Sequence, residues 1–380
     1  GPQTPSMRGS GADAVLVLVD GVPLNDPITG EADLSGLSTS GVESITVLPG
    51  GQSARYGARA AAGVILVRTG SPKGETTVAG GAGSLGERNA EVATAWASFG
   101  GRLDAMGIYR RRDGGFDFEV PREFGGGASR LTNADSRVWS GRLAWTQDAA
   151  EGPATVGISG EHVGRGLPGR SFAPSPQARQ ALTQARLFAS GARDMSASSS
   201  GRASGYVQYY QSHFLDPAPP FGDPFDDRTT LIGGGGETSL SRTLGQGTLE
   251  FGMAANHLRV ESTVLSAVVA PSRTDLGAWL SVAYANGPLG TSWTGAIRLD
   301  RSGLPAQWFG SHDIRVQRTM RTLTFHAGHR SSFSPPTLGD QFFREGVGVE
   351  PNPDLRAERV PSEWVAGAGL RADRRAVVLS

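Results

Sequence analysis

The residues best suited to metal chemistry are two histidines and a group of aspartates. His326 and His329 lie three residues apart, and in an extended strand this spacing points their rings to opposite faces. Four acidic residues fall within one short segment: Asp216, Asp223, Asp226 and Asp227. Their carboxylates could coordinate a cation, but they lack a ligand register such as that of the EF-hand, so a solvated loop is the favoured interpretation. The sequence therefore predicts no metal site.

The sequence lacks the residues that covalent catalysis and nucleotide binding require. The chain has no cysteine, which excludes disulfides, thiolate zinc sites and cysteine nucleophiles. Four glycines at 233–236 are not followed by Lys-Ser/Thr, so they do not form a phosphate-binding loop, and neither a nucleophile elbow nor an HExxH motif occurs. Because 36 Lys and Arg balance 36 Asp and Glu, nothing favours nucleic acid as a partner. We expect neither an enzyme nor a cofactor.

The elements that would position functional residues in this chain are strands. Hydrophobic residues make up 38% of the sequence, and the mean hydropathy is −0.24. No stretch reaches the roughly 18 apolar residues that a membrane-spanning helix requires. A soluble protein and a membrane β-barrel share such averages, because only alternate residues of a barrel strand face lipid. The 55 glycines disfavour helices and are typical of a β-protein with many turns.

The first part of the chain predicts a small mixed domain. Residues 14–19 form a short apolar run that ends at a turn, and 42–48 and 63–69 form two further strand patterns. The segment 70–74 (Gly-Ser-Pro-Lys-Gly) breaks the pattern and suggests a boundary. We therefore assign residues 1–72 to one domain, which is small enough to be only marginally stable on its own.

From about residue 75 the sequence alternates large apolar residues with small or polar ones. The clearest same-parity sets are listed here: Trp139, Leu143 and Trp145 in 136–147, and Trp293, Ile297 and Leu299 in 291–300. A period of two gives each strand one apolar and one wet face. We predict that these six side chains face lipid.

The connections between these segments alternate short and long along the chain. This alternation is typical of an up-and-down membrane barrel, with tight turns at one end and longer loops at the other. Residues 73–380 hold about 14 strands and a partial last one, against roughly 22 in the larger outer-membrane barrels. We therefore expect a curved, open sheet whose edge strands, near Thr76 and Val378, are unpaired.

Several motifs, in order along the chain, resemble the plug and barrel of TonB-dependent outer-membrane receptors. The plug-like segments are SMRG at 6–9, VLVLVDGVPLND at 15–26 and GVESITVLPGGQSARYGARAAAGVILVRT at 41–69. FSPPTLGDQFF at 333–343 and NPDLRAERVPSEW at 352–364 resemble a barrel loop and the strand that follows it. Thr46, Pro49 and 66–68 depart from the plug pattern, which puts in doubt that every plug–barrel ion pair of the family is kept.

The resemblance implies a fold and a function. The fold would be an all-β membrane protein, an incomplete antiparallel transmembrane β-barrel of about 14–15 strands around a small α+β plug fragment. The function would be active uptake of a scarce nutrient, such as an iron-siderophore, cobalamin or haem, across the bacterial outer membrane. Its partners would be the TonB complex, reached through a missing N-terminal segment, a small-molecule or metal-chelate substrate, and outer-membrane lipid.

The resemblance also implies site residues, all of them in the plug. By the family's layout, substrate would touch the apex loops Ser10–Asp13 and Asn25–Gly30, and the predicted contacts are Ser10, Asp13, Asn25, Asp26 and Thr29. The structural motif residues are Arg8, Gly9, Asp20, Gly21, Glu43, Gly50, Ser53, Arg55, Tyr56, Gly57, Arg59 and Gly63. Glycines in this set suit tight turns or close backbone approach. The charged residues either pair with barrel-wall charges or are ordinary turn caps and solvated charges.

Two other functions stay open. A plugged receptor could bind or signal at the surface without transport, and a TonB box or signalling domain ahead of Gly1 would discriminate. A soluble β-rich adhesin or propeller would leave the plug-like motifs unexplained. The opening GPQTPSMRGS has no signal-peptide pattern, so we expect that the true N-terminus lies upstream.

Overall fold

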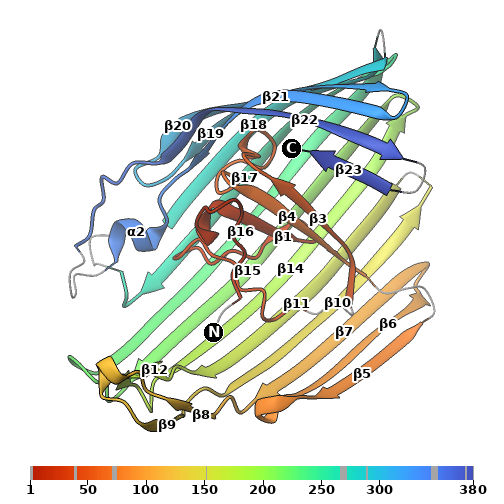
Figure 1. Ribbon diagram of the computed structural model, residues 1–380. Helices are drawn as coiled ribbons and strands as arrows, with labels where there is room; N and C mark the ends of the chain where they lie inside the picture. The colour runs from red at the N-terminus through yellow and green to blue at the C-terminus, as the bar shows by residue number, and fades with distance from the viewer. Residues whose placement is uncertain are drawn as a thin grey trace.

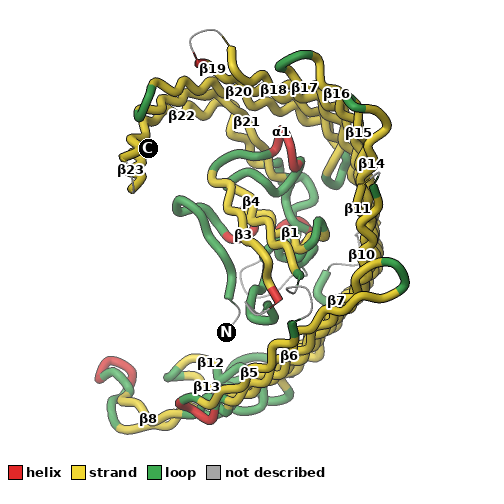
Figure 2. The backbone as a smooth tube through the Cα atoms, turned by 90° about the vertical axis from the view of Figure 1, so that its right-hand side faces the viewer, coloured by secondary structure: helices red, strands yellow, loops and turns green. Residues whose placement is uncertain are grey.

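The computed structural model describes residues 3–37, 41–70, 75–150, 152–265, 272–287, 290–343, 350–372 and 375–379. They form a small N-terminal sheet and a large curved sheet, which we call the wall (Figures 1 and 2). Within the described residues, no helix has the length and apolar character needed to cross a membrane.

The small sheet belongs to the predicted plug and has four strands in the order β2-β1-β4-β3. Their bounds are β1 (Val15–Val19), β2 (Val22–Pro23), β3 (Val42–Pro49) and β4 (Gly63–Thr69). β1 and β4 pair in parallel, so β1 is central and buried, as its continuous apolar run predicted. The one-turn helix α1 (Ser53–Tyr56) lies between β3 and β4. The three strands predicted in this part of the chain are confirmed.

The wall contains 15 strands, each antiparallel to its neighbours. In chain order they are β5 (Thr76–Ala82), β6 (Arg88–Ser98), β7 (Gly101–Arg112), β10 (Ser136–Ala149), β11 (Gly152–Gly166), β14 (Arg179–Ser196), β15 (Ser199–Asp216), β16 (Phe225–Leu244), β17 (Gly247–Ser262), β18 (Ser272–Gly287), β19 (Thr291–Ser302), β20 (Gln307–Met320), β21 (Leu323–Ser334), β22 (Glu358–Ala372) and β23 (Arg375–Leu379). The predicted number, about 14 and a partial last strand, is confirmed.

The wall is an open sheet around the plug. Its edge strands are β5 and β23, and no pairing joins them in the described part of the chain. Figure 2 shows the wall as an arc with β1, β3 and β4 of the plug inside its curve. The predicted open sheet wrapped partly around the plug is therefore confirmed.

The connections of the wall alternate as predicted, with three differences. The connection expected to be long at 301–311 is short, because β19 ends at Ser302 and β20 begins at Gln307. A tight turn joins β14 and β15 at residues 197–198, where Ala-Ser gave no turn signal. The strands also run further into the predicted long loops, so that β11 ends at Gly166 and β14 begins at Arg179. The long connections hold the hairpins β8–β9 (Phe116–Glu119, Ala128–Leu131) and β12–β13 (Gly169–Arg170, Ala173–Pro174), and the helix α2 (Leu338–Phe342).

The apolar residues predicted to share one face lie on the convex, outer side of the wall. Trp139, Leu143, Trp293, Ile297 and Leu299 are between 41% and 60% exposed, whereas residues of the other parity meet the plug. Trp145 is half-buried, and its indole N–H donates to the Ser98 carbonyl at 3.1 Å. An exposed apolar band of this kind is typical of barrel strands that face lipid.

Candidate functional site

The two loops predicted to contact a ligand meet in the structure. Gly30 has a φ of +78°, and a Cβ built on it would lie 3.0 Å from Cβ of Asp13 and 2.8 Å from Cγ2 of Thr337. Thr337 caps α2, and its side chain and that of Asp340 form a reciprocal capping box. The structure therefore brings Ser10–Asp13 and Asn25–Gly30 together with the long connection between β21 and β22.

Asn25 shapes the second loop from inside. Its side chain is buried, and its amide group donates to the carbonyls of Val15 at 2.8 Å and Gly30 at 2.7 Å. Its Oδ1 accepts the N–H of Val17 at 2.9 Å. These three bonds satisfy backbone groups that the loop would otherwise leave unpaired. The geometry thus gives Asn25 a structural role in the plug.

Asp26 fastens the same loop to the wall. One carboxylate oxygen accepts the N–H of Ile28 at 2.6 Å and of Thr29 at 3.2 Å. The other accepts the hydroxyl of Tyr210 on β15. Ile28 packs into an apolar cluster with wall and α2 residues: Val138, Val163, Leu182, Tyr210, Leu231, Val260, Leu338 and Phe342. The loop is therefore docked on the wall.

The remaining predicted contact residues are more open. Thr29 is exposed, and Ser10 and Asp13 are half-buried. The Ser10 hydroxyl donates to the Met7 carbonyl at 2.6 Å, which closes its loop. Thr29 and Asp13 are consequently the predicted contacts whose side chains the structure leaves most available.

Three charged motif residues form ion pairs with wall residues, which is one of the two interpretations that the sequence left open. Asp20 accepts from Nε of Arg142 at 3.0 Å, with both side chains largely buried. Two weaker pairs are longer and more exposed: Arg55–Glu250 at 3.4 Å and Arg8–Glu363 at 3.5 Å. Burial decides how much each ion pair stabilises the plug, because exposed pairs contribute only about 0–1 kcal/mol. Asp20–Arg142 is the main ionic attachment among these three.

A fourth attachment was not predicted. Asp33 accepts from Nη1 of Arg165 on β11 at 3.1 Å and from the backbone N–H groups of Gln3 and Ser35. Burial raises the pKa of the Asp33 carboxyl, but these hydrogen bonds and the Arg165 charge outweigh it and hold the pKa below its ordinary range. Asp33 is therefore a charged anchor of the plug at neutral pH.

The motif glycines leave room for wall arginines. A Cβ on Gly50, whose φ is +77°, would lie 1.7 Å from Nη2 of Arg330, and one on Gly57 would lie 2.9 Å from Nη2 of Arg298. Arg330 also donates to the Pro49 carbonyl at 3.2 Å and forms an ion pair with Glu363. These glycines are thus required by close approach of the plug to the wall.

The other motif residues lie in α1, on β3 and in the turns and strands of the plug. Ser53 is fully buried in α1, and its hydroxyl oxygen accepts the N–H of Phe333 at 3.2 Å. Tyr56 is half-buried, with the guanidinium of Arg55 5.7 Å from its ring centroid. Glu43 is exposed on β3. Gly9 and Gly21 take φ values of +78° and +83°, and a Cβ on Gly63 would lie 2.8 Å from the Leu48 carbonyl oxygen.

Cavities lie between the plug and strands β11 to β20. One of about 190 Å³ is lined by Arg59 of the plug and by polar wall residues that include Tyr206, Asn256 and Arg273. Two others, of about 390 and 380 Å³, flank α1 and share Arg55 and Tyr56. The plug therefore fits the wall loosely on this side, and polar groups face the space.

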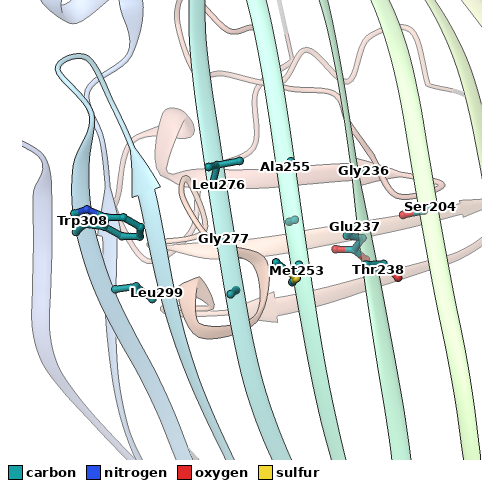
Figure 3. Close-up of a pocket in the computed structure, with 12 residues that line it drawn as sticks. Ser204, Gly236, Glu237, Thr238, Met253, Ala255, Leu276, Gly277, Leu299 and Trp308 are labelled. Carbon is teal, nitrogen blue, oxygen red and sulfur yellow. The ribbon is translucent and has the colours of Figure 1, made fainter.

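A further groove of about 550 Å³ lies on the other side of the same strands. Figure 3 shows the wall strands in front of the plug, with Met253, Leu276, Leu299 and Trp308 around the groove. Its lining is mostly apolar and belongs to the outer band. We therefore separate it from the candidate site, which lies between plug and wall.

The histidines and aspartates considered for metal binding lie apart or have other partners. On β21, His329 lies on the outer face beside Trp364 and bonds to His312 at 2.9 Å, so it does not share a site with His326. In the aspartate segment, Asp226 pairs with His213, and Asp216 accepts the Ala218 N–H. Among the described residues, no group of three or more His, Asp or Glu could hold a metal ion.

Several site residues were not predicted from the sequence. Arg142, Arg165, Tyr210, Arg298 and Arg330 all reach the plug from the wall. Each lies on the inner-face parity of its strand, which is the one signal that could have selected them. Parity alone does not say which inner residue stands opposite which plug residue.

The comparisons with known proteins agree with this architecture. Residues 1–64 match the family model of the TonB-dependent receptor plug domain. Among solved structures, the chain is similar to a copper transporter, OprC, with a TM-score of 0.74 and 17% identity over 95% of this chain and 61% of that one.

Two receptors from Pseudomonas aeruginosa are similar in the same way. The siderophore receptor PirA has a TM-score of 0.69 and 19% identity, over 98% of this chain and 66% of that one. A Q482A mutant of the ferric enterobactin receptor PfeA, in complex with enterobactin, has a TM-score of 0.72 and 16% identity, over 97% and 64%. The chain thus spans less than two thirds of the length of these structures, and at such identities the likeness shows the fold.

Proposed function

We propose that this chain is part of a TonB-dependent receptor and takes part in energy-coupled uptake of a scarce nutrient across the bacterial outer membrane. The substrate would be a small molecule or metal chelate, such as an iron-siderophore, haem or cobalamin. It would bind from outside, and the TonB complex would then rearrange the plug.

The observation that carries the proposal is the way in which the plug is held. Two buried charge pairs, Asp20–Arg142 and Asp33–Arg165, and the apolar contact of Ile28 attach it, while cavities lie between the rest of the plug and strands β11 to β20. Polar attachments of this kind can be exchanged for water when a force moves the plug, because the released groups stay hydrated in a wet lumen. An apolar interface of the same size would resist such movement.

The proposed substrate contacts are the open residues of the apex loops, Asp13 and Thr29, with Ser10 beside them. Asn25 and Asp26 would act through the loop that they shape. The outer apolar band, with Ile297 and Leu299 at its middle, would face the lipid of the outer membrane.

A plug–wall cross-link tests the proposal. A Cβ on Gly51 would lie 2.9 Å from Cβ of Ser332, so a shift of the backbone by about 1 Å would give the separation of about 3.8 Å that a disulfide needs. In the full-length receptor, Gly51→Cys/Ser332→Cys should bind ferric siderophore, haem or cobalamin as the parent does but lose uptake of it. A reductant should restore uptake, and each single variant is the control, since the chain has no cysteine of its own. Undiminished uptake by the oxidised double variant would contradict plug movement, and binding without any uptake in the parent would favour a surface receptor.

A further inference from the structure

Arg59 presents an unpaired guanidinium group to the cavity between plug and wall. It follows α1, has a φ of +68°, and lines the space of about 190 Å³. Within the part of the chain that the structure describes, its guanidinium makes no hydrogen bond or ion pair. A left-handed φ costs a residue with a Cβ roughly 1–2 kcal/mol, so the backbone holds Arg59 in this place against a local preference.

The wall opposite Arg59 adds polar groups to the same cavity. The Tyr206 hydroxyl donates to Oδ1 of Asn256 at 2.9 Å, so the Asn256 NH2 group is the part that remains to donate. Gln208 lines the cavity as well. Neither amide nitrogen has a hydrogen-bond acceptor among the described residues. The cavity therefore offers a cation and two amide donors.

The glycine run 233–236 makes room for this arrangement. A Cβ on Gly235 would lie 1.9 Å from Oδ1 of Asn256, so only glycine leaves the Asn256 amide its place. Gly277 acts similarly, because a Cβ there would lie 2.2 Å from Nη2 of Arg298. The run that has no phosphate-loop pattern in the sequence thus shapes the wall of the cavity.

The acidic groups of the cavity are largely committed to other partners. Asp275 accepts from Arg273 at 2.9 Å and from Ser302 at 2.6 Å, and Asp300 accepts from Arg298 at 2.8 Å. Glu237 lines both this cavity and the neighbouring one beside α1. None of these carboxylates bonds to Arg59.

The charge balance around Arg59 points the same way. Burial and then the positive charge of Arg273 lower the pKa of Arg59, and the opposing effects of Asp275, Tyr206 and Asp26 do not restore it. An anion bound beside Arg59 would stabilise its charged form and offset the repulsion between Arg59 and Arg273.

We propose that this cavity is an oxyanion-binding site, in which Arg59, with Asn256 and Gln208, holds a carboxylate or phosphate group. A guanidinium binds both groups through paired hydrogen bonds. The space suits one such group with a few waters rather than a whole chelate. The anion could be free in solution or be the acidic group of a larger ligand.

Titration of the purified full-length receptor with inorganic phosphate and with acetate tests the proposal. Binding is followed by calorimetry at constant ionic strength, with chloride as the reference anion. Arg59→Asn is the chosen variant, because Asn tolerates a left-handed φ better than other charge-free residues. We expect binding to weaken by about tenfold or more, as for loss of one charge-assisted hydrogen bond. Arg59→Lys should keep part of the affinity.

A matched control and a second variant complete the test. Arg68→Gln removes one positive charge from the plug outside the 190 Å³ cavity and should bind as the parent does. Asn256→Asp keeps the shape of the side chain and should abolish binding by repulsion, so the test stands even if Arg59→Asn does not fold. The proposal would be overturned if the parent bound neither anion. It would also be overturned if Arg59→Asn and Asn256→Asp bound the anions as tightly as the parent does. Uptake is not the readout, so this result is independent of the proposed transport.

Discussion

The Asp20–Arg142 pair gives the sharpest test of how the plug is attached. Asp20 accepts from Arg142 at 3.0 Å, from the Thr69 N–H at 2.9 Å and from the Thr69 hydroxyl at 2.5 Å. Its side chain is 14% exposed and that of Arg142 is 10% exposed. Asp20→Ala removes all three bonds and leaves the guanidinium buried without its carboxylate. Breaking a buried pair from one side costs about 3–5 kcal/mol.

Hydrogen exchange of the plug amides in the full-length receptor measures this cost. A loss of about 3 kcal/mol should lower the protection of β1 and β4 on the order of 100-fold, since each 1.4 kcal/mol is tenfold. The matched control is Arg8→Gln, which removes a pair at 3.5 Å whose arginine is 56% exposed. It should change protection by about fivefold at most, because such pairs contribute about 0–1 kcal/mol.

The double variant Asp20→Ala/Arg142→Met tests the physical reason for the lost protection in Asp20→Ala. If the cost comes from an arginine buried without its partner, removing that charge should recover part of the lost protection. Equal effects of Asp20→Ala and Arg8→Gln would refute the reasoning. So would a double variant that is less protected than Asp20→Ala.

Three further predictions concern the close contacts, the pH dependence and the outer band. Gly50→Ala should destabilise the plug by more than about 1 kcal/mol in urea unfolding, because its φ is +77° and its Cβ would displace Arg330; unchanged stability would contradict the close approach. The attachment through Asp33 should be fully present above the ordinary carboxyl pKa of about 3.9 and be lost as the pH falls through the lower pKa of Asp33 in the folded protein. Hydrogen exchange of the plug amides should therefore show an acid-dependent step that is missing in Asp33→Asn. Ile297→Arg should cost about 2–4 kcal/mol in the folding equilibrium of the barrel in lipid, whereas the lumen-facing Thr294→Arg should cost much less, and equal costs would contradict the assignment of the two faces.

Much of the fold is determined locally and was therefore predictable. A period of two and turn residues at regular spacing specify strands and hairpins, and an antiparallel meander needs only neighbours in sequence to pair. The plug strands were similarly marked by apolar runs that end at Asp20-Gly21 and Pro49-Gly50. The turn at residues 197–198 was missed because nothing in Ala-Ser distinguishes it from the strands on either side.

The site depended on the tertiary structure. Asp20 and Arg142 lie 122 residues apart in the chain, and Asp26 and Tyr210 lie 184 apart. The sequence specified that these side chains face a lumen, but the stagger of the strands and the position of the plug decided which of them meet. Asn25 and Asp26 were predicted as ligand contacts from their motif, and the structure turns both toward the plug backbone and the wall. Arg59 is the reverse case. The neighbouring charges pair within β18 (Arg273–Asp275) and within β19 (Arg298–Asp300), and only the tertiary structure shows that this leaves the Arg59 guanidinium without a partner.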